Sequence, residues 1–176
     1  MIYINPTPNA DSRTATKPLD KETLLENTYA HIQHVNDALD YFVDMIQVAA
    51  IRHDWTKIQF IDDFLRDATS GAVGKDFKKL PWFQIHMTQE RHHLLDRCPD
   101  NVTLIDLLER VADITMAGMA RSGVIFDTEI PSEILQLAYK NTISLLKDQV
   151  IVTNKITRVP YMSAALATNP EGDEKE

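Results

Sequence analysis

A long stretch without proline or glycine is the feature that most restricts what this chain can fold into. Residues 21–50 contain neither of these helix-breaking residues. Asp20, just before the stretch, is a residue type that caps helix N-termini, and acidic Glu22 follows in the first turn. The sequence therefore predicts one long amphipathic helix with a single face to bury. The residues of that face recur at helical spacing: Leu24, Thr28, Val35, Leu39, Phe42, Ile46 and Ala49.

Shorter helical patterns follow, separated by proline, glycine and turn residues. Pro81 and Pro131 each suit the first turn of a helix, whereas Gly123 suits the residue that ends one. The stretch 68–80, with two glycines and several lysines, is expected to be a loop, and 150–161 is compatible with a short extended pair. Together with the long helix, these patterns predict an all-α bundle of about five helices. The shorter helices are predicted at 56–67, 81–97, 103–122 and 131–148.

The length of 176 residues suits one compact domain, and a hydrophobic fraction of 44% supplies its core. Residues 1–20, rich in proline, asparagine and hydroxyl side chains, are expected to form an extended N-terminal arm. The helical domain should occupy residues 21–150. A C-terminal segment, 151–176, follows it, and its last ten or so charged residues are expected to be disordered.

Composition excludes several classes of protein. The one cysteine, Cys98, rules out an internal disulfide framework and a zinc ribbon and fits a reducing cytoplasm. The chain has no run of about 18 apolar residues and no secretory-signal pattern at its start, so we expect a cytoplasmic protein without membrane contact. With 18 basic and 26 acidic side chains, the net charge of −8 argues against generic nucleic-acid binding. A small anionic substrate stays open, because a metal site can outweigh net charge locally.

The six histidines all lie between residues 31 and 93. At about 100° per residue, His31 falls at the centre of the apolar face of the long helix, and His34 falls at its edge. A buried imidazole needs a partner, either a backbone carbonyl or a metal ion. His53 and Asp54 are neighbours at the end of the same helix. Adjacent side chains on a regular helix point about 100° apart, so this pair converges on one ion only where the helix ends or breaks.

Three further histidines lie close together on the predicted helix 81–97. His86 and His93 are seven residues apart, which places them within about 20° of each other, while His92 points about 120° away. Regular helical geometry therefore pairs His86 with His93. A kink would change this preference and bring His92 into the same group.

A stripe of carboxylates follows on the predicted helix 103–122. Asp106, Glu109 and Asp113 lie within about 60° of one another, bordered by alanines. One interpretation is a solvated face, which is the commoner arrangement. The other is an inward acidic seam beside a cation, with the alanines leaving room for it.

The order of these features resembles that of the HD-domain superfamily of metal-dependent hydrolases. A histidine, a His-Asp doublet, further histidines and a late aspartate follow one another on successive helices, and the resemblance covers about residues 28–123. The segments YAHIQHV, RHDWTK, ERHH and LIDLLERVAD also resemble the HIxxV, HDxSK, RHH and LIDLxE blocks of a small, poorly characterised bacterial and phage group within that superfamily. The resemblance implies a helical fold that holds one or two divalent metal ions.

In that superfamily the first-helix histidine, the doublet and the late aspartate bind one ion, and further histidines bind a second ion that the doublet aspartate bridges. The resemblance implies Mn, Fe, Co, Ni or Zn, which suit imidazole and carboxylate ligands and lower the pKa of a bound water. The implied ligands are His31, His53, Asp54 and Asp113 for one ion and His86 with His93 for the other, with His92 and His34 as alternatives.

Two residues after the doublet bear on the reaction class. HD-type nucleotidases often have a glutamate at the position of Lys57, whereas Asp62 falls where those enzymes keep an acid. A lysine at this position resembles the HD-type cyclic-dinucleotide phosphodiesterases and the HD-type di-iron oxygenases. The resemblance implies that Lys57 contacts substrate or protonates a leaving oxygen and that Asp62 assists, while a lysine exposed at the start of a helix is the alternative.

Phosphate recognition requires positive partners besides a metal. Candidate substrate-binding residues are Arg52 and Arg91 together with the loop lysines Lys75, Lys78 and Lys79, although loop lysines commonly serve solubility alone. The loop 68–80 lies between the doublet and His86 and is a candidate lid. Trp55 and Trp82 lie beside the motifs, where each either stacks a base or belongs to the core.

The sequence and the resemblance together favour a metal-dependent phosphohydrolase that acts on a nucleotide or another small phosphate ester. A di-iron oxygenase is the alternative among enzymes. A binding module that keeps the metal and sequesters a nucleotide or a partner protein is the alternative outside them. Homo-oligomerisation is compatible with the chain, but no sequence feature decides it.

Overall fold

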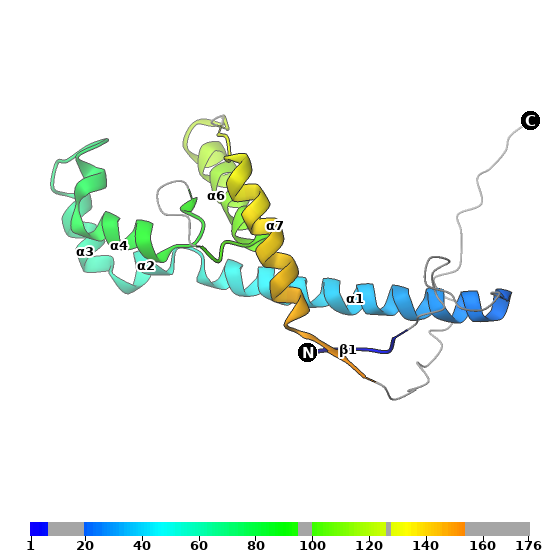
Figure 1. The fold of residues 1–176 in the computed structure, drawn as a ribbon. Helices are drawn as coiled ribbons and strands as arrows, with labels where there is room; N and C mark the ends of the chain where they lie inside the picture. Colours follow the sequence, from blue (N-terminus) through cyan, green and yellow to red (C-terminus); the bar gives the residue numbers. More distant parts are fainter. Residues whose placement is uncertain (7–19, 95–99, 126–127, 154–176) are drawn as a thin grey trace, which may run out of the picture. The chain divides into compact units, whose positions relative to one another are not determined.

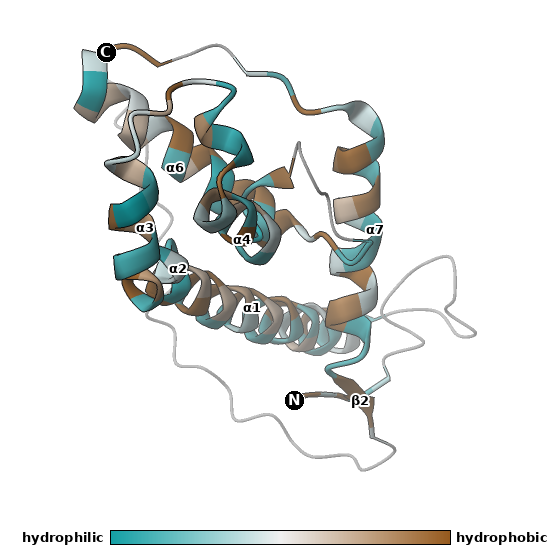
Figure 2. Ribbon diagram, turned by 90° about the vertical axis from the view of Figure 1, so that its left-hand side faces the viewer, coloured by the Kyte–Doolittle hydropathy of each residue, from teal (hydrophilic) through white to brown (hydrophobic). Residues whose placement is uncertain are grey.

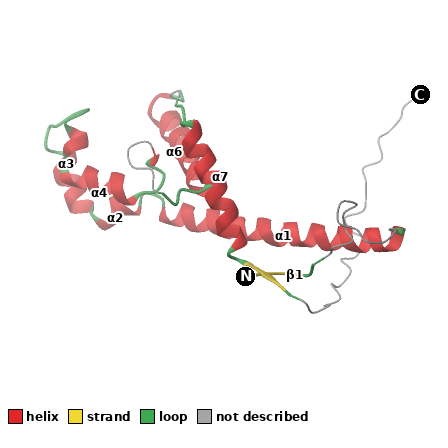
Figure 3. Cartoon of the chain, in the orientation of Figure 1, coloured by secondary structure: helices red, strands yellow, loops and turns green. Residues whose placement is uncertain are grey.

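The computed structural model describes residues 1–6, 20–94, 100–125 and 128–153. The predicted disorder at the C-terminus and most of the predicted arm lie outside these residues. The fold is mostly helical, as predicted (Figure 1 and Figure 3). Among the described residues, no helix is both long and apolar enough to cross a membrane. The elements in chain order are β1 (Ile2–Ile4), α1 (Lys21–Arg52), α2 (Trp55–Gln59), α3 (Ile61–Ala68), the 3₁₀ helix η1 (Phe77–Lys79), α4 (Pro81–Gln89), α6 (Leu104–Ser122), α7 (Ser132–Lys147) and β2 (Val150–Val152).

The chain divides into two compact units, one of residues 1–35 with 151–176 and one of residues 36–150. In the first unit, β1 pairs with β2, and the Thr153 amide donates to the Ile4 carbonyl at 2.9 Å just beyond the strands. The start of the segment 150–161 is extended, as predicted, but its partner is β1, and the rest of the predicted pair lies outside the described residues. All the side chains of the candidate site lie in the second unit.

The second unit has two packed regions. A core cluster forms where α6 packs with α7 and contains Leu94, Val102, Leu107 and Ala138, all of them buried. The other region joins α3 and α4 through Trp82, which is 2% exposed. Its indole ring stacks on Phe64 with 3.9 Å between ring centroids. These two regions position the helices that carry the site.

Local signals explain where the helices begin and end. Thr103 and Asp106 form a capping box at the start of α6, with the Thr103 amide donating to Asp106 Oδ2 at 2.7 Å. Gly123 ends α6 in the left-handed region at φ 69°. The predicted helix 56–67 is divided in two at Phe60, which leaves the helical region with φ −113° and ψ 40°.

The predicted helix 81–97 ends early. Pro81 begins α4 as expected, but the helix stops at Gln89, and Glu90 is extended with ψ 118°. The chain leaves the helix where the Glu90 carboxylate accepts hydrogen bonds from Thr56 on another element. A distant partner therefore overrides the local helical pattern at this point.

The long helix differs from its prediction in burial. α1 has the predicted extent, but none of its residues is buried. His31, which we expected on a buried face, is exposed, and Leu39 is 54% exposed. Figure 2 shows hydrophobic positions distributed along α1. An amphipathic pattern identifies a face that is able to pack, but it does not identify what packs on it.

Candidate metal centre

A break between two helices brings His53 and Asp54 together. α1 ends at Arg52 and α2 begins at Trp55. Asp54 between them has φ 57°, which makes it the one non-glycine residue with positive φ among those described. Such a conformation is disfavoured for residues with a side chain and is concentrated at functional sites. Here it turns Asp54 Oδ2 to within 3.6 Å of His53 Nε2, so the chain supplies the break that an adjacent pair of ligands requires.

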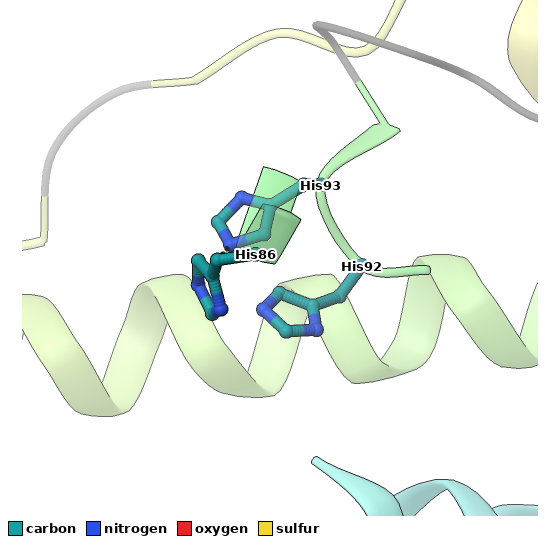
Figure 4. A group of neighbouring side chains, drawn as sticks. All are labelled: His86, His92 and His93. Atoms are coloured by element: carbon teal, nitrogen blue, oxygen red, sulfur yellow. Dashed lines mark hydrogen bonds between the residues drawn. The ribbon is translucent and has the colours of Figure 1, made fainter. Parts of the chain in front are cut away.

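His86, His92 and His93 converge beside this break (Figure 4). His86 comes from α4, while His92 and His93 come from the non-helical turn after it. The Nε2 atoms of His86 and His93 lie 2.8 Å apart, and His92 Nε2 lies 3.7 Å from Asp54 Oδ1. The geometric preference for His93 over His92 assumed a continuous helix. It does not apply here, because both rings reach the cluster.

The carboxylate stripe of α6 faces inward at this site, which is the second of its two interpretations. Glu109 Oε1 lies 2.9 Å from His53 Nδ1 and 3.0 Å from His92 Nδ1. Asp113 Oδ1 lies 3.8 Å from His53 Nε2. The sequence placed Glu109 in the stripe without giving it a role. Its spacing of three and four residues from Asp106 and Asp113 was the signal for that role.

Glu90 is a site residue that the sequence analysis did not identify. Its buried carboxylate accepts hydrogen bonds from the Thr56 amide at 2.9 Å and from the Thr56 hydroxyl at 2.6 Å. The hydroxyl has one proton and gives it to Glu90, so its oxygen accepts from His86 Nδ1, 2.7 Å away. The spacing of four residues from His86 could have indicated Glu90.

These contacts fix the tautomers of three histidines. His53 and His92 donate through Nδ1 to Glu109, and His86 donates through Nδ1 to Thr56, so Nε2 of each neutral ring carries no proton. The unprotonated Nε2 of His86 accepts a hydrogen bond from His93 Nε2, 2.8 Å away. Oxygen acceptors that orient imidazole ligands in this way are the usual outer partners of protein metal sites.

The Nε2 atoms of His53, His86 and His92 all lie near the same carboxylate. They lie 3.6–3.7 Å from the oxygens of Asp54, too far for hydrogen bonds. Asp54 Oδ1 is itself buried and has no hydrogen-bond partner. A cation between these atoms removes the repulsion and satisfies the buried oxygen. The donor set therefore fits a divalent transition metal.

Three overlapping groups of ligand atoms, each within 4.8 Å, describe the same centre. Asp54 belongs to two of them, so its two oxygens are able to serve neighbouring ions. The groups are His86–His92–His93, His53–Asp54–His92 and Asp54–His86–Glu90.

The protonation states of His86, His93 and Asp54 agree with a metal-binding role, whereas that of His92 competes with it. Burial, followed by the charge of a neighbouring histidine, lowers the pKa of His86 and of His93 to about 4, so both rings are neutral near pH 7. Burial opposes ionisation of Asp54, but the hydrogen bond and charge of Lys57 outweigh it and lower the pKa of this carboxyl. Burial likewise opposes the charged form of His92, but Glu109 raises its pKa. The extra proton of a charged His92 ring occupies Nε2, where a metal would bind.

Asp54, His86, His92, His93 and Asp113 of the cluster line a cleft of about 430 Å³. Lys57 and Arg121 bring positive charge to it, and Phe77 and Phe83 are among its aromatic walls. The Lys57 ammonium contacts Asp54 Oδ2. A second, larger cavity of about 930 Å³ lies in the same unit and is lined by α1, α6 and α7 residues.

Trp82 belongs to the core and is not a stacking platform. One face of its ring stacks on Phe64 and the other side approaches His86, whose ring centroid is 5.1 Å away. Because Trp82 is 2% exposed, no face remains for a base. The indole instead packs against the His86 ring and restricts its orientation.

The predicted substrate-binding cations lie away from the metal cleft. Arg52 and Arg91 line the larger cavity, and Arg91 donates to both carboxylate oxygens of Asp106, at 2.6 and 2.8 Å. The segment between α3 and α4 contributes Phe77 to the lining of the cleft, but none of its lysines lines the cleft. Lys75, Lys78 and Lys79 are exposed, and Lys79 pairs with Asp76.

Three other predicted site residues are not among the residues that line the cleft. Asp62 is exposed in the first turn of α3. His31 and His34 lie on the part of α1 that belongs to the first unit. Their roles as ligands or catalytic groups remain predictions from the resemblance.

The chain has no match among protein-family models, curated proteins or solved structures. The likeness to HD-domain proteins therefore rests on the sequence blocks given above. The metal centre rests independently on the geometry of its side chains.

Proposed function

We propose that this chain is a metal-dependent phosphohydrolase that acts on a nucleotide or another small phosphate ester. The observation that carries the proposal is the convergence of the Nε2 atoms of His53, His86 and His92 on the Asp54 carboxylate, whose buried Oδ1 has no hydrogen-bond partner, beside a cleft with cationic side chains. Neither a structural core nor a solvated acidic face needs ring nitrogens turned toward a buried carboxylate. The order of the HD-like sequence blocks supports the same class of reaction.

The metal ligands in this proposal are those that the break and the turn bring together. His53, Asp54 and His92 form one set. His86 and His93 form a second set, which is connected to Asp54 through His86, whose Nε2 lies 3.6 Å from Asp54 Oδ1. One or two ions of Mn, Fe, Co, Ni or Zn suit these donors. Asp113, 3.8 Å from His53 Nε2, is placed to complete the first set.

A divalent metal held there would lower the pKa of a bound water to near neutrality and offset charge on a phosphoryl group. The chain's own contribution is orientation and charge. Glu109 holds the His53 and His92 rings, and the Glu90–Thr56 pair holds His86. Lys57 now neutralises Asp54. With a metal ion bound at that carboxylate, the Lys57 ammonium would be free to bind an anionic substrate in the cleft.

Metal analysis followed by a substrate panel tests the proposal. Protein purified without chelators and reconstituted with each candidate ion is expected to retain at least one ion per chain. It should then release phosphate or a nucleoside from at least one member of a panel of nucleoside phosphates, cyclic dinucleotides and a generic phosphomonoester. The Asp54→Ala variant should lose both metal and turnover.

The alternatives predict different outcomes of the same experiment. Metal retention with tight nucleotide binding but no turnover would replace the proposal with a binding module. Iron retention with oxygen consumption and no hydrolysis would replace it with an oxygenase. Failure to retain any of the five metals would overturn the metal centre itself.

A further inference from the structure

α1 carries an apolar repeat that is longer than any other described helix of the chain. Its positions alternate in steps of three and four residues across four heptads, which is the a/d pattern of helices that pair along their length. The a positions are Leu25, Ile32, Leu39 and Ile46, and the d positions are Thr28, Val35, Phe42 and Ala49.

Most of this stripe is exposed in the part of the chain that the structure describes. No residue of α1 is buried, and Ile32, Leu39 and Ile46 are 48%, 54% and 42% exposed. The hydrophobic positions can be followed along the helix in Figure 2. Helices in proteins are stabilised mainly by packing of their apolar face, and continuous exposed apolar surface marks an interaction site. The stripe therefore requires an occupant.

The charges of α1 favour an identical helix as that occupant. All carboxylates between Leu25 and Ala49 lie at the b and f heptad positions, away from the seam. The flanking e and g positions in this stretch carry no carboxylate, although the chain as a whole is acidic. Two copies can thus pair without bringing like charges together, whereas acids at e and g would repel. The carboxylates concerned are Glu26, Asp37, Asp40 and Asp44.

The length of the stripe also favours a second copy of the chain as its partner. α1 has 32 residues and spans about 48 Å. The next longest described helices, α6 with 19 residues and α7 with 16, span about 29 and 24 Å. A partner helix of equal length covers a seam of four heptads completely. Among the described parts of the chain, α1 alone has that length, so a second copy supplies it.

We propose that two copies of this chain associate through the a/d stripe of their α1 helices. A two-fold axis brings the same stripe of each copy onto the other, which is the commonest symmetry of soluble dimers. The association gives the apolar face of α1 the burial that its sequence predicts. It does not depend on the metal centre or on the reaction proposed for it.

The mass of the full chain in solution tests this proposal. Light scattering after size exclusion, at tens of micromolar protein, should give twice the chain mass of 20.0 kDa. A wild-type protein with the mass of one chain under these conditions would overturn the proposal, because the stripe would then be covered from within the chain or by a different protein.

A matched pair of variants locates the interface. Leu39→Glu places a carboxylate at the centre of the seam and should shift the mass to that of one chain, with the helical circular dichroism retained. Ile51→Glu adds the same charge to the same helix at an f position that is 83% exposed, and it should remain a dimer. If Leu39→Glu stays fully dimeric, the dimer uses another surface and the proposal fails.

A milder variant covers the case in which Leu39→Glu does not fold. Leu39→Ala removes apolar contact from the seam without adding charge, and we expect the dimer dissociation constant to rise about tenfold or more. An unchanged dissociation constant in folded Leu39→Ala would count against the α1 seam.

Discussion

At the residue scale, Glu109 is the group that most directly determines the geometry of the centre. A single oxygen, Oε1, accepts from Nδ1 of His53 and from Nδ1 of His92. These two rings come from different parts of the chain, one from the break after α1 and the other from the turn after α4. Glu109 therefore joins the two elements and aligns two ligands at once, although it does not itself have to bind the ion.

Glu109→Gln is expected to weaken metal binding by about 10–100-fold, the range found when an outer hydrogen-bond partner of a ligand is altered. The amide keeps the shape of the side chain but loses the negative charge that orients both rings. Competition against a chromophoric chelator measures the affinity. Glu133→Gln, at an exposed glutamate on α7, is the matched control. Equal affinities in the two variants would show that Glu109 does not orient the ligands.

Lys57→Ala separates metal binding from substrate binding. The variant should retain its metal, because Lys57 donates no lone pair to it, and kcat/KM should fall about 10–100-fold through the loss of one charged hydrogen bond to phosphate. Lys75→Ala, at an exposed lysine that does not line the cleft, should leave kcat/KM unchanged. An unchanged kcat/KM in Lys57→Ala would show that Lys57 does not bind substrate and only pairs with Asp54.

At the scale of elements, local sequence signals predicted the helices better than their ends or their surroundings. The proline-free stretch predicted α1, Pro81 predicted the start of α4, and Gly123 predicted the end of α6. The break at Asp54 was required by the adjacent ligand pair and is present. These features depend on neighbouring residues, which is why they can be derived from sequence.

Features that depend on contacts between distant residues could not be derived from local sequence signals. α4 stops at Gln89, and the next residue, Glu90, binds Thr56, 34 residues earlier in the sequence, a contact that no local pattern records. The sequence did not decide whether the α6 stripe faces inward, for the same reason. The sequence pattern of a carboxylate stripe is the same whether the stripe faces water or histidines. Once α4 ends early, His92 joins the site, although regular helical geometry had set it aside.

The packing of α6 onto α7 gives a prediction at this scale. Leu107 is 6% exposed within the core cluster, whereas its neighbour Leu108 is 53% exposed on the same helix. Leu107→Ala should lower the free energy of unfolding by about 2–5 kcal/mol through lost burial and a residual cavity. Leu108→Ala should change it by about 0.5 kcal/mol or less. Urea unfolding followed by circular dichroism measures both, and similar losses would place the core of this unit elsewhere.

At the scale of the whole molecule, the metal centre links parts of the second unit that are far apart in sequence. Its ligands come from the α1–α2 break, from α4 and from the turn that follows, and α6 supplies the groups that orient them. Without a cation, the Nε2 atoms of His53, His86 and His92 lie near a carboxylate whose buried oxygen has no hydrogen-bond partner. The centre should therefore contribute to stability as well as to reactivity.

Metal removal should lower the thermal stability of the wild-type chain. An ion that binds only the folded state adds about 2.7 kcal/mol when its free concentration is about 100 times its dissociation constant. For a chain of this size, that corresponds to a fall in Tm of roughly 5–10 °C when a chelator removes the ion. Asp54→Ala lacks the carboxylate that belongs to one ligand set and lies beside the other, so its Tm should not respond to the chelator. A wild-type Tm that is indifferent to chelation, despite measured metal loss, would show that the ion binds folded and unfolded chains alike, as an unstructured histidine-rich segment does, and the built centre described here would be wrong.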